Sequence, residues 1–104
     1  MNRHNSKDAN HDVIAQRFRD LGCSVIEMHA TGIPGFPDLA IGLIGARGRM
    51  TQLVEVKNPN TRYGRAGFND NQTAFARDWR GEKVSIVTSV DEATALVQNW
   101  RRAA

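Results

Sequence analysis

The sequence predicts an α/β fold in which a mixed sheet is flanked by helices, in the order αβββαβα. The observations behind it are apolar residues at helical spacing in three segments, apolar β-rich runs in four others, and helix-capping residues before the later helices. The 104 residues suit one domain, 1–104, with a single core. Residues 1–7 contain no apolar segment, and we expect them to be flexible.

The first predicted helix and strand occupy the beginning of the chain. Capping residues at 8–10 precede a helical pattern that ends at Gly22, with these apolar members: Val13, Ile14, Phe18 and Leu21. Residues 24–28 are typical of a short strand. In residues 31–37, two prolines and two glycines obstruct both a helix and a strand ladder, so we expect a loop.

A β-hairpin is predicted in the middle of the chain. Residues 38–44 and 50–56 are apolar, β-rich runs on either side of a Gly-Ala-Arg-Gly turn at 45–48. If the hairpin is symmetric about the middle of this turn, Asp38 lies directly opposite Glu55. The Cβ atoms of such a cross-strand pair are about 4.5 to 5.5 Å apart on one face of the sheet.

The remaining residues predict a loop, a helix, a strand and a final helix. Residues 58–69 are polar and form a loop long enough to suggest a function. A capping box, Asn69 with Gln72, starts a helix with these residues on one side: Phe75, Ala76 and Trp79. Residues 84–88 form the fourth strand, and a second capping box at 89–92 opens a helix with these residues inward: Ala93, Leu96, Val97 and Trp100. We expect both tryptophans to pack in the core rather than to stack on nucleic-acid bases.

Charged residues interrupt the two hydrophobic runs of the hairpin. Two like charges, Asp38 and Glu55, disfavour the fold at this distance unless a cation joins them or one is protonated. Side-chain alternation puts Lys57 on the face of Glu55 and directs Val56 into the core. Two carboxylates, with the Val56 carbonyl as a further ligand, suit Mg²⁺ or Mn²⁺, and a metal beside an ammonium group is typical of phosphodiester hydrolysis. The simpler alternative is that Asp38 caps the preceding turn and Glu55 forms an ion pair with Lys57.

The same residues resemble a known nuclease signature. Pro37-Asp38, followed after sixteen residues by Glu55-Val56-Lys57, resembles the PD-(D/E)XK motif. Over about residues 8–98 the chain resembles the small phage and bacterial VRR-NUC nucleases, which are similar to archaeal Holliday-junction resolvases. The segments that carry this resemblance are Gly35-Phe36-Pro37-Asp38-Leu39, Leu53-Val54-Glu55-Val56-Lys57 and Asn71-Gln72. It implies a restriction-endonuclease-like core.

The resemblance also implies roles for individual residues. The implied catalytic residues are Asp38, Glu55, Lys57 and Gln72, of which the two acids hold Mg²⁺ or Mn²⁺. Many relatives have a further metal-directed glutamate in the first helix, but residues 8–13 contain none. Asp12 or Asn10 is the replacement that the sequence offers, and the alternative for Asp12 is a charge that complements the helix dipole. The number of metal ions and the additional ligand stay open.

Basic residues gather in the sequence around Asp38 and Glu55, the acidic pair. The formal net charge is +3, and arginine and lysine outnumber aspartate and glutamate between residues 47 and 80. We expect Arg62 and Arg65 to grip phosphate and Tyr63 to stack on an unpaired base. Arg47 and Arg77 complete the predicted DNA-binding residues, although a solvated basic face is the alternative interpretation. The three histidines have no spacing that builds a zinc site, and we expect them on the surface or in loops.

The sequence therefore predicts a Mg²⁺- or Mn²⁺-dependent DNA endonuclease that acts on branched DNA such as Holliday junctions. A four-way junction needs two symmetric nicks, so we expect a twofold homodimer. The alternatives are a nuclease acting on single-stranded, flap or linear duplex DNA, and a nucleic-acid-binding module on the same fold that does not cut. No apolar run approaches the roughly 18 residues of a membrane span, so we expect no membrane partner and a cytoplasmic protein, in a bacterial host if the gene is carried by a phage.

Overall fold

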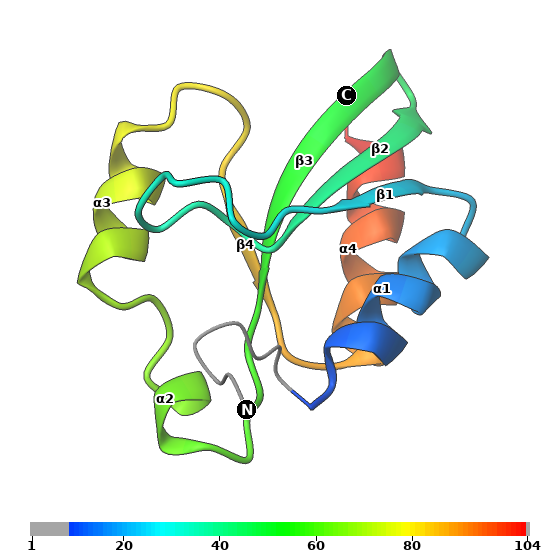
Figure 1. Ribbon diagram of the computed structural model, residues 1–104. Coiled ribbons are helices and arrows are strands. Elements are labelled where there is room, and N and C mark those ends of the chain that lie inside the picture. The colour runs from blue at the N-terminus through cyan, green and yellow to red at the C-terminus, as the bar shows by residue number, and fades with distance from the viewer. Residues whose placement is uncertain (1–8, 104) are drawn as a thin grey trace.

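The computed structural model describes residues 9–103, and its elements follow the predicted order with one addition (Figure 1). They are α1 (His11–Asp20), β1 (Ser24–Glu27), β2 (Leu39–Gly45), β3 (Gly48–Val56), α2 (Arg62–Arg65), α3 (Asp70–Asp78), β4 (Ser85–Val87) and α4 (Val90–Arg102). The addition is α2, a short helix within the segment expected to be a loop. The expected flexibility of residues 1–7 lies outside the described residues.

The strands form one mixed sheet, as the sequence predicts. Its strand order is β1-β2-β3-β4, in which β1, β2 and β3 are antiparallel neighbours and β4 runs parallel to β3. The long β2–β3 hairpin is therefore central, and β4 pairs only with the last residues of β3, from Val54 to Val56. None of the helices in residues 9–103 is long and apolar enough to cross a membrane.

The predicted hairpin register is confirmed. Leu39 pairs with Val54 and Gly45 pairs with Gly48 across the turn, so the hairpin is symmetric about its middle. Continuing this register by one residue sets Asp38 opposite Glu55. Asp38 itself lies one residue before β2, and its carbonyl accepts a hydrogen bond from the Met28 N–H at 2.7 Å, which continues the pairing to the chain after β1.

One face of the sheet packs against α1 and α4 to make the hydrophobic core. Strand residues at alternate positions contribute fully buried side chains, among them Leu39, Ile41, Val54 and Val56. Phe18 of α1 stacks on Trp100 of α4 with ring centroids 6.1 Å apart, so Trp100 packs against the core as expected. Alternation along the strands directs the neighbouring positions, Asp38 and Glu55 included, to the opposite face.

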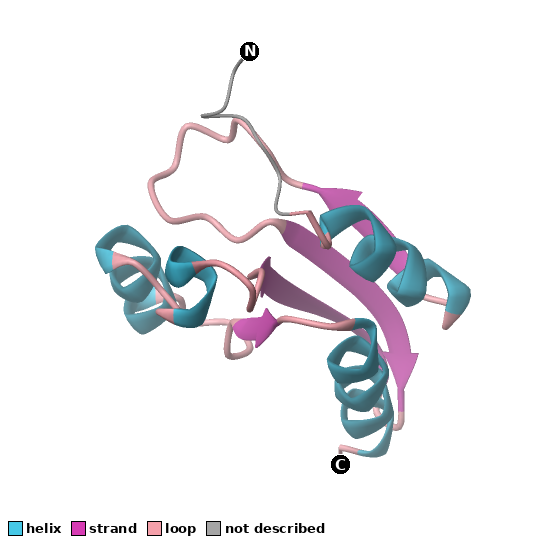
Figure 2. Ribbon diagram, turned by 90° about the horizontal axis from the view of Figure 1, so that it is seen from below, coloured by secondary structure: helices cyan, strands magenta, loops and turns pink. Residues whose placement is uncertain are grey.

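Helices α2 and α3 lie on the other side of the molecule from α1 and α4 (Figures 1 and 2). No residue of α3 is buried, and Trp79 just after it is 43% exposed, so the expectation that Trp79 packs in the core is wrong. Helical spacing shows that a helix has an apolar side, but it does not show what covers that side. Here the covering element is the loop at 31–37, whose Phe36 meets Phe75 edge to face at 5.2 Å.

The loop comes into close contact with α3 at a glycine. Gly35 has φ +76°, and a Cβ added there would lie 2.1 Å from the backbone oxygen of Asn71. The loop backbone therefore rests directly on the first turn of α3. Gly32 in the same loop has a similar φ of +78° but no atom within 4 Å of an added Cβ, so it has the same conformation without the close approach.

We predict that Gly35→Ala destabilises the protein more than Gly32→Ala. Both substitutions place a Cβ in the left-handed region, which costs on the order of 1 to 2 kcal/mol. Only Gly35→Ala also forces the loop away from α3, for which overpacking data suggest about 1 to 3 kcal/mol more. Urea unfolding followed by circular dichroism measures both, and equal losses would show that the loop is not seated on α3.

Candidate active site

Asp38 is turned across the hairpin toward the end of β3. Its Oδ2 atom accepts a hydrogen bond from the Val56 N–H at 2.8 Å. This bond fixes the carboxylate beside the strand that carries Glu55. The alternative in which Asp38 caps the preceding turn is therefore wrong, because its side chain bonds to the neighbouring strand.

Glu55 is a buried carboxyl group in the middle of the sheet. It lies between β2 and β4, and the residue is only 5% exposed. The pKa of Glu55 is raised from 4.5 to about 8, chiefly because burial disfavours the charged form. The charge of Asp38 and a hydrogen bond with its carboxyl group also raise this pKa, and Lys57 lowers it. The two carboxyl groups are therefore neighbours, as the register predicted, and the uncharged form of Glu55 is favoured beside Asp38.

A single amide, that of Gln72, connects Glu55 to Lys57. Its Nε2 donates to Glu55 Oε2 at 2.7 Å, and its Oε1 accepts from Lys57 Nζ at 2.8 Å. Lys57 Nζ is itself 3.5 Å from Glu55 Oε2. The ammonium group is thus held by two neighbours in a site where Lys57 is only 9% exposed. The simpler ion pair between Glu55 and Lys57 is present, but it is one part of a larger network.

The position of Gln72 follows from the start of α3. Asn69 is the N-cap, its side chain accepts from the Gln72 N–H at 2.9 Å, and Gln72 Oε1 accepts from the Asn69 N–H at 2.9 Å. This is the predicted capping box. Because the same Oε1 atom also accepts from Lys57, the amide that begins the helix also orients the ammonium group.

The main chain at the end of β3 is held from the side of α1. Asn10, the N-cap of α1, donates through Nδ2 to the Lys57 carbonyl at 3.1 Å and to the Thr88 carbonyl at 3.0 Å. The Lys57 N–H donates to the Val87 carbonyl at 2.9 Å. The sequence suggested Asn10 only as a helix cap or a metal ligand. No local pattern indicates that its side chain would join Lys57 and Thr88, which are far from it in the chain.

Asp12 belongs to a different cluster from Asp38 and Glu55. One ligand atom each of His11, Asp12 and Glu27 lie within 4.8 Å of one another, and His11 Nε2 is 3.1 Å from Glu27 Oε1. His11 is 3% exposed, so the expectation that the histidines lie on the surface or in loops is wrong for this residue. Periodicity gave no sign of it, because its partner Glu27 comes from the neighbouring strand.

The basic and aromatic residues expected to bind DNA fall into separate places. Arg62, Tyr63 and Arg65 lie on α2, close after Lys57 in the chain, and Tyr63 is 85% exposed. Arg77 lies on α3, where its guanidinium pairs with the Asp78 carboxylate at 2.9 and 3.1 Å. Arg47 lies in the hairpin turn, eight positions from Glu55 and thus about 26 Å away at the usual rise of a strand. The first group therefore follows Glu55 and Lys57 closely in the chain, whereas Arg47 lies at the far end of the hairpin.

The donor set at the acidic pair fits a hard divalent cation. A cation at this pair would offset the repulsion from Asp38, which adds to the effect of burial in raising the Glu55 pKa. The Val56 N–H points to Asp38, and since the N–H and C=O of one strand residue point to the same side, the Val56 carbonyl faces that side as well. Oxygen donors of this kind suit Mg²⁺ or Mn²⁺.

The fold has a counterpart among solved structures. A structure described as a VRR_NUC domain matches with a TM-score of 0.63 and 28% sequence identity, over 86% of this chain and 91% of that one. The α/β fold predicted from the sequence is therefore that of a VRR_NUC structural neighbour. No protein-family model matches the chain, and no curated protein matches it significantly.

We predict that the free energy of unfolding in EDTA falls as pH rises from about 4.5 to about 8. Glu55 has a raised pKa in the folded state, so the folded chain binds more protons than the unfolded chain in this window, and stability decreases with pH. Chemical denaturation at several pH values measures the slope. Glu55→Gln, whose amide does not ionise, should flatten it, and exposed Glu82→Gln should keep it. A wild-type slope that survives in Glu55→Gln would contradict the assignment.

Proposed function

We propose that this chain is a DNA endonuclease that depends on Mg²⁺ or Mn²⁺ and hydrolyses phosphodiester bonds. The observation that carries the proposal is the pair of neighbouring carboxyl groups, half-buried Asp38 and buried Glu55, beside an ammonium group that Gln72 fixes. The match to a VRR_NUC domain structure supports a nuclease over other uses of two acidic groups.

Each residue of the pair has a distinct task in this proposal. Asp38 and Glu55 would hold the metal ion, with the Val56 carbonyl as a further oxygen ligand. The ion would stabilise negative charge on the phosphate and lower the pKa of a bound water. Asp38 is kept in place by the Val56 N–H, so its carboxylate is oriented before any substrate arrives. Asp12 lies with His11 and Glu27, which favours its omission from this ligand set.

Lys57 and Gln72 complete the proposed machinery. The Lys57 ammonium group offers donors to the phosphate oxygens, whose negative charge grows as the bond to the attacking water forms. Gln72 orients this group by accepting a hydrogen bond from Lys57 Nζ at 2.8 Å. Because the same amide donates to Glu55 at 2.7 Å, Gln72 keeps the acid and the cation at a fixed separation. In nearly water-free surroundings these interactions are stronger than on the surface.

DNA contacts in this proposal come from α2 and α3. Arg62 and Arg65 would bind the backbone phosphates, and Tyr63, with its exposed ring, would stack on a base. Arg77 is a weaker candidate because its guanidinium already pairs with Asp78. Arg47 is too far from the acidic pair to contact the nucleotide being cut, so its contribution would be to a distant part of the duplex.

We predict that removing either an acid or the ammonium group stops cleavage without stopping DNA binding. Asp38→Asn, Glu55→Gln and Lys57→Ala should each lower kcat by about 100-fold or more, since they remove charge stabilisation of the transition state. Cleavage of labelled DNA in Mg²⁺, Mn²⁺ or EDTA gives the rates, and fluorescence anisotropy in EDTA gives the affinities.

The matched controls for this experiment are exposed residues of the same types. Glu82→Gln and Lys83→Ala change the same charges away from the acidic pair and should cut at the wild-type rate. A Glu55→Gln protein that cuts normally in Mg²⁺ would overturn the assignment. If the wild-type protein binds DNA but cuts nothing in either metal, the chain is the non-cleaving binding module instead.

We further propose branched DNA as the substrate and a twofold homodimer as the active assembly. One acidic pair cuts one strand, and the symmetric cleavage of a four-way junction needs two such pairs related by a twofold axis. The prediction is that four-way DNA is cut faster than linear duplex or flap DNA of the same arm sequence, and that sedimentation finds two chains on each junction. Faster cutting of single-stranded, flap or linear DNA would favour the alternative substrates.

A further inference from the structure

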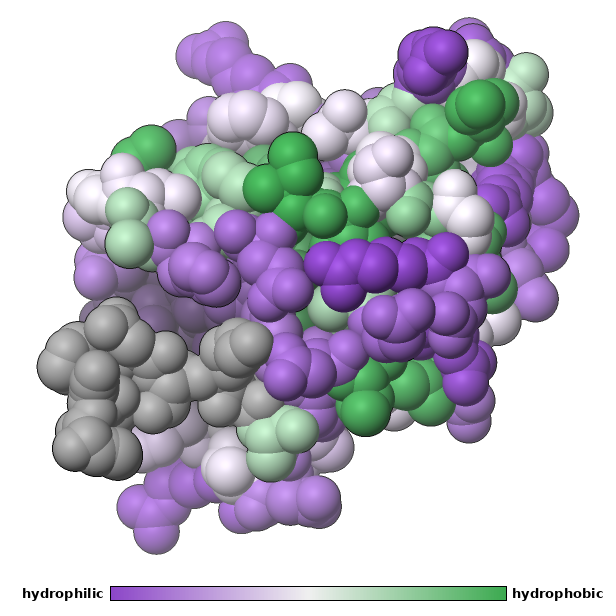
Figure 3. All heavy atoms as spheres, turned by 45° about the vertical axis from the view of Figure 1, so that its right-hand side comes forward, coloured by the Kyte–Doolittle hydropathy of each residue, from purple (hydrophilic) through white to green (hydrophobic). Residues whose placement is uncertain are grey.

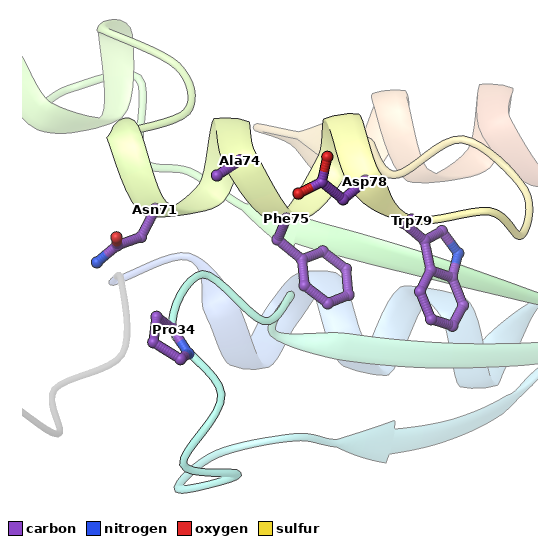
Figure 4. A pocket seen from close by; sticks show the side chains of 6 residues that line it. All are labelled: Pro34, Asn71, Ala74, Phe75, Asp78 and Trp79. Carbon is purple, nitrogen blue, oxygen red and sulfur yellow. The ribbon is translucent and has the colours of Figure 1, made fainter.

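An apolar pocket lies on the side of α3 that faces the 31–37 loop (Figure 4). Its volume is about 300 Å³, and it is lined by Pro34, Asn71, Ala74, Phe75, Asp78 and Trp79. The rings of Phe75 and Trp79 project from the same side of the helix. The face in Figure 3 carries hydrophobic residues among hydrophilic ones.

The aromatic rings form a ladder that leaves one end open. Phe36 meets Phe75 edge to face at 5.2 Å, and Phe75 stacks on Trp79 with centroids 5.5 Å apart and 17° between the ring planes. Trp79 ends the ladder and is 43% exposed. An indole with an open face binds a further flat ring well, because aromatic stacking adds to the burial of apolar surface.

The rim of the pocket carries polar groups suited to the edge of a base. Asn71 offers both a hydrogen-bond donor and an acceptor, and Asp78 offers acceptors, which is the pattern that binds exocyclic amino groups and ring nitrogens. Arg77 pairs with the Asp78 carboxylate, so its negative charge is balanced next to a passing phosphate backbone. A pocket at the lower end of the roughly 300 to 1,000 Å³ found for ligand sites holds one flat ring system.

Next to the pocket lies a recess that includes one residue of the proposed reaction centre. This polar recess, lined in part by Gln72, shares Pro34 and Asn71 with the pocket. Along α3, Trp79 lies seven positions after Gln72, which corresponds to about 10 Å at 1.5 Å per residue. That distance is about three nucleotide steps at 3.4 Å per nucleotide of a stacked strand.

We infer that this pocket binds an unpaired nucleobase of the DNA, a few nucleotides from the bond that is cut. The inference rests on the proposed function for its choice of DNA, and it adds a requirement for unpaired bases near the cleavage point. Trp79 and Phe75 supply the stacking surface, and Asn71 and Asp78 contact the edge of the base. A fully paired duplex keeps its bases stacked inside the helix and does not fill the pocket.

The test measures binding in EDTA, where no cleavage occurs. A Trp100→Phe protein has Trp79 as its remaining tryptophan, so its fluorescence reports on the pocket alone. Adding a short single-stranded oligonucleotide should quench this emission, and adding the same sequence as a duplex should not. Trp79→Ala should weaken single-strand binding about 5- to 100-fold, the usual loss when one stacked base loses its aromatic partner. Its effect on duplex binding should be below twofold.

Two controls separate stacking from a loss of structure. Trp79→Phe keeps an aromatic ring and should restore most of the affinity, while Trp100→Phe should bind as the wild type does. An oligonucleotide with one abasic site at the pocket position should lose affinity for the wild-type protein but not for Trp79→Ala. Thermal unfolding by circular dichroism checks that the variants fold.

Several outcomes would overturn the inference. Equal losses on single strands and duplex, or an unquenched Trp79, would show that no base enters the pocket. Self-association of the wild type that Trp79→Ala abolishes would assign the pocket to a second copy of the chain. Failure of the proposed function is distinguishable, because a protein that cuts no DNA but still binds single strands through Trp79 loses that function and keeps this pocket.

Discussion

Asp38 and Glu55 bring two carboxyl groups together at the buried end of the β2–β3 hairpin, where each negative charge raises the free energy of the other. The Val56 N–H, the Gln72 amide and the Lys57 ammonium group surround the pair and partly offset this repulsion. The offset is incomplete, since burial and the neighbouring acid still raise the Glu55 pKa to about 8. A bound cation would remove this repulsion and so stabilise the pair.

Gln72 makes the geometry of this pair depend on how α3 is attached. Its amide closes the capping box of the helix and also bonds to Glu55 and Lys57. The helix has no buried residue and is held through the loop at 31–37, where Gly35 allows the two backbones to touch. The acidic pair belongs to the rigid hairpin, whereas the group that orients the ammonium belongs to a less buried element. Movement of α3 would therefore take the Gln72 amide away from both Lys57 and Glu55, whereas Asp38 would keep its hydrogen bond from the Val56 N–H.

The sequence contained enough information for the hairpin and too little for the contacts around it. Two apolar runs on either side of a four-residue turn fix the register, and the register alone places Asp38 opposite Glu55. The Asn10 bridge to Lys57 and Thr88 spans 47 and 78 positions, and no local pattern indicates contacts of that range. Trp79 was misassigned for a related reason, because the apolar spacing of α3 is the same whether a core or a ligand covers it. Buried His11 likewise owes its position to Glu27 on another element.

One face of the sheet carries the hydrophobic core and the other carries the proposed reaction centre, and the end of β3 contributes residues to both. On the α1 and α4 face, Val56 is fully buried in the core. On the other face, Glu55 and Lys57 meet the amide of α3. The main chain between them is fixed at successive atoms, by Asp38 at the Val56 N–H and by Val87 and Asn10 at the N–H and C=O of Lys57. A catalytic group must be held to within about 0.5 Å to be effective. Core packing on one face thus positions charged groups on the other through a backbone with little freedom to shift.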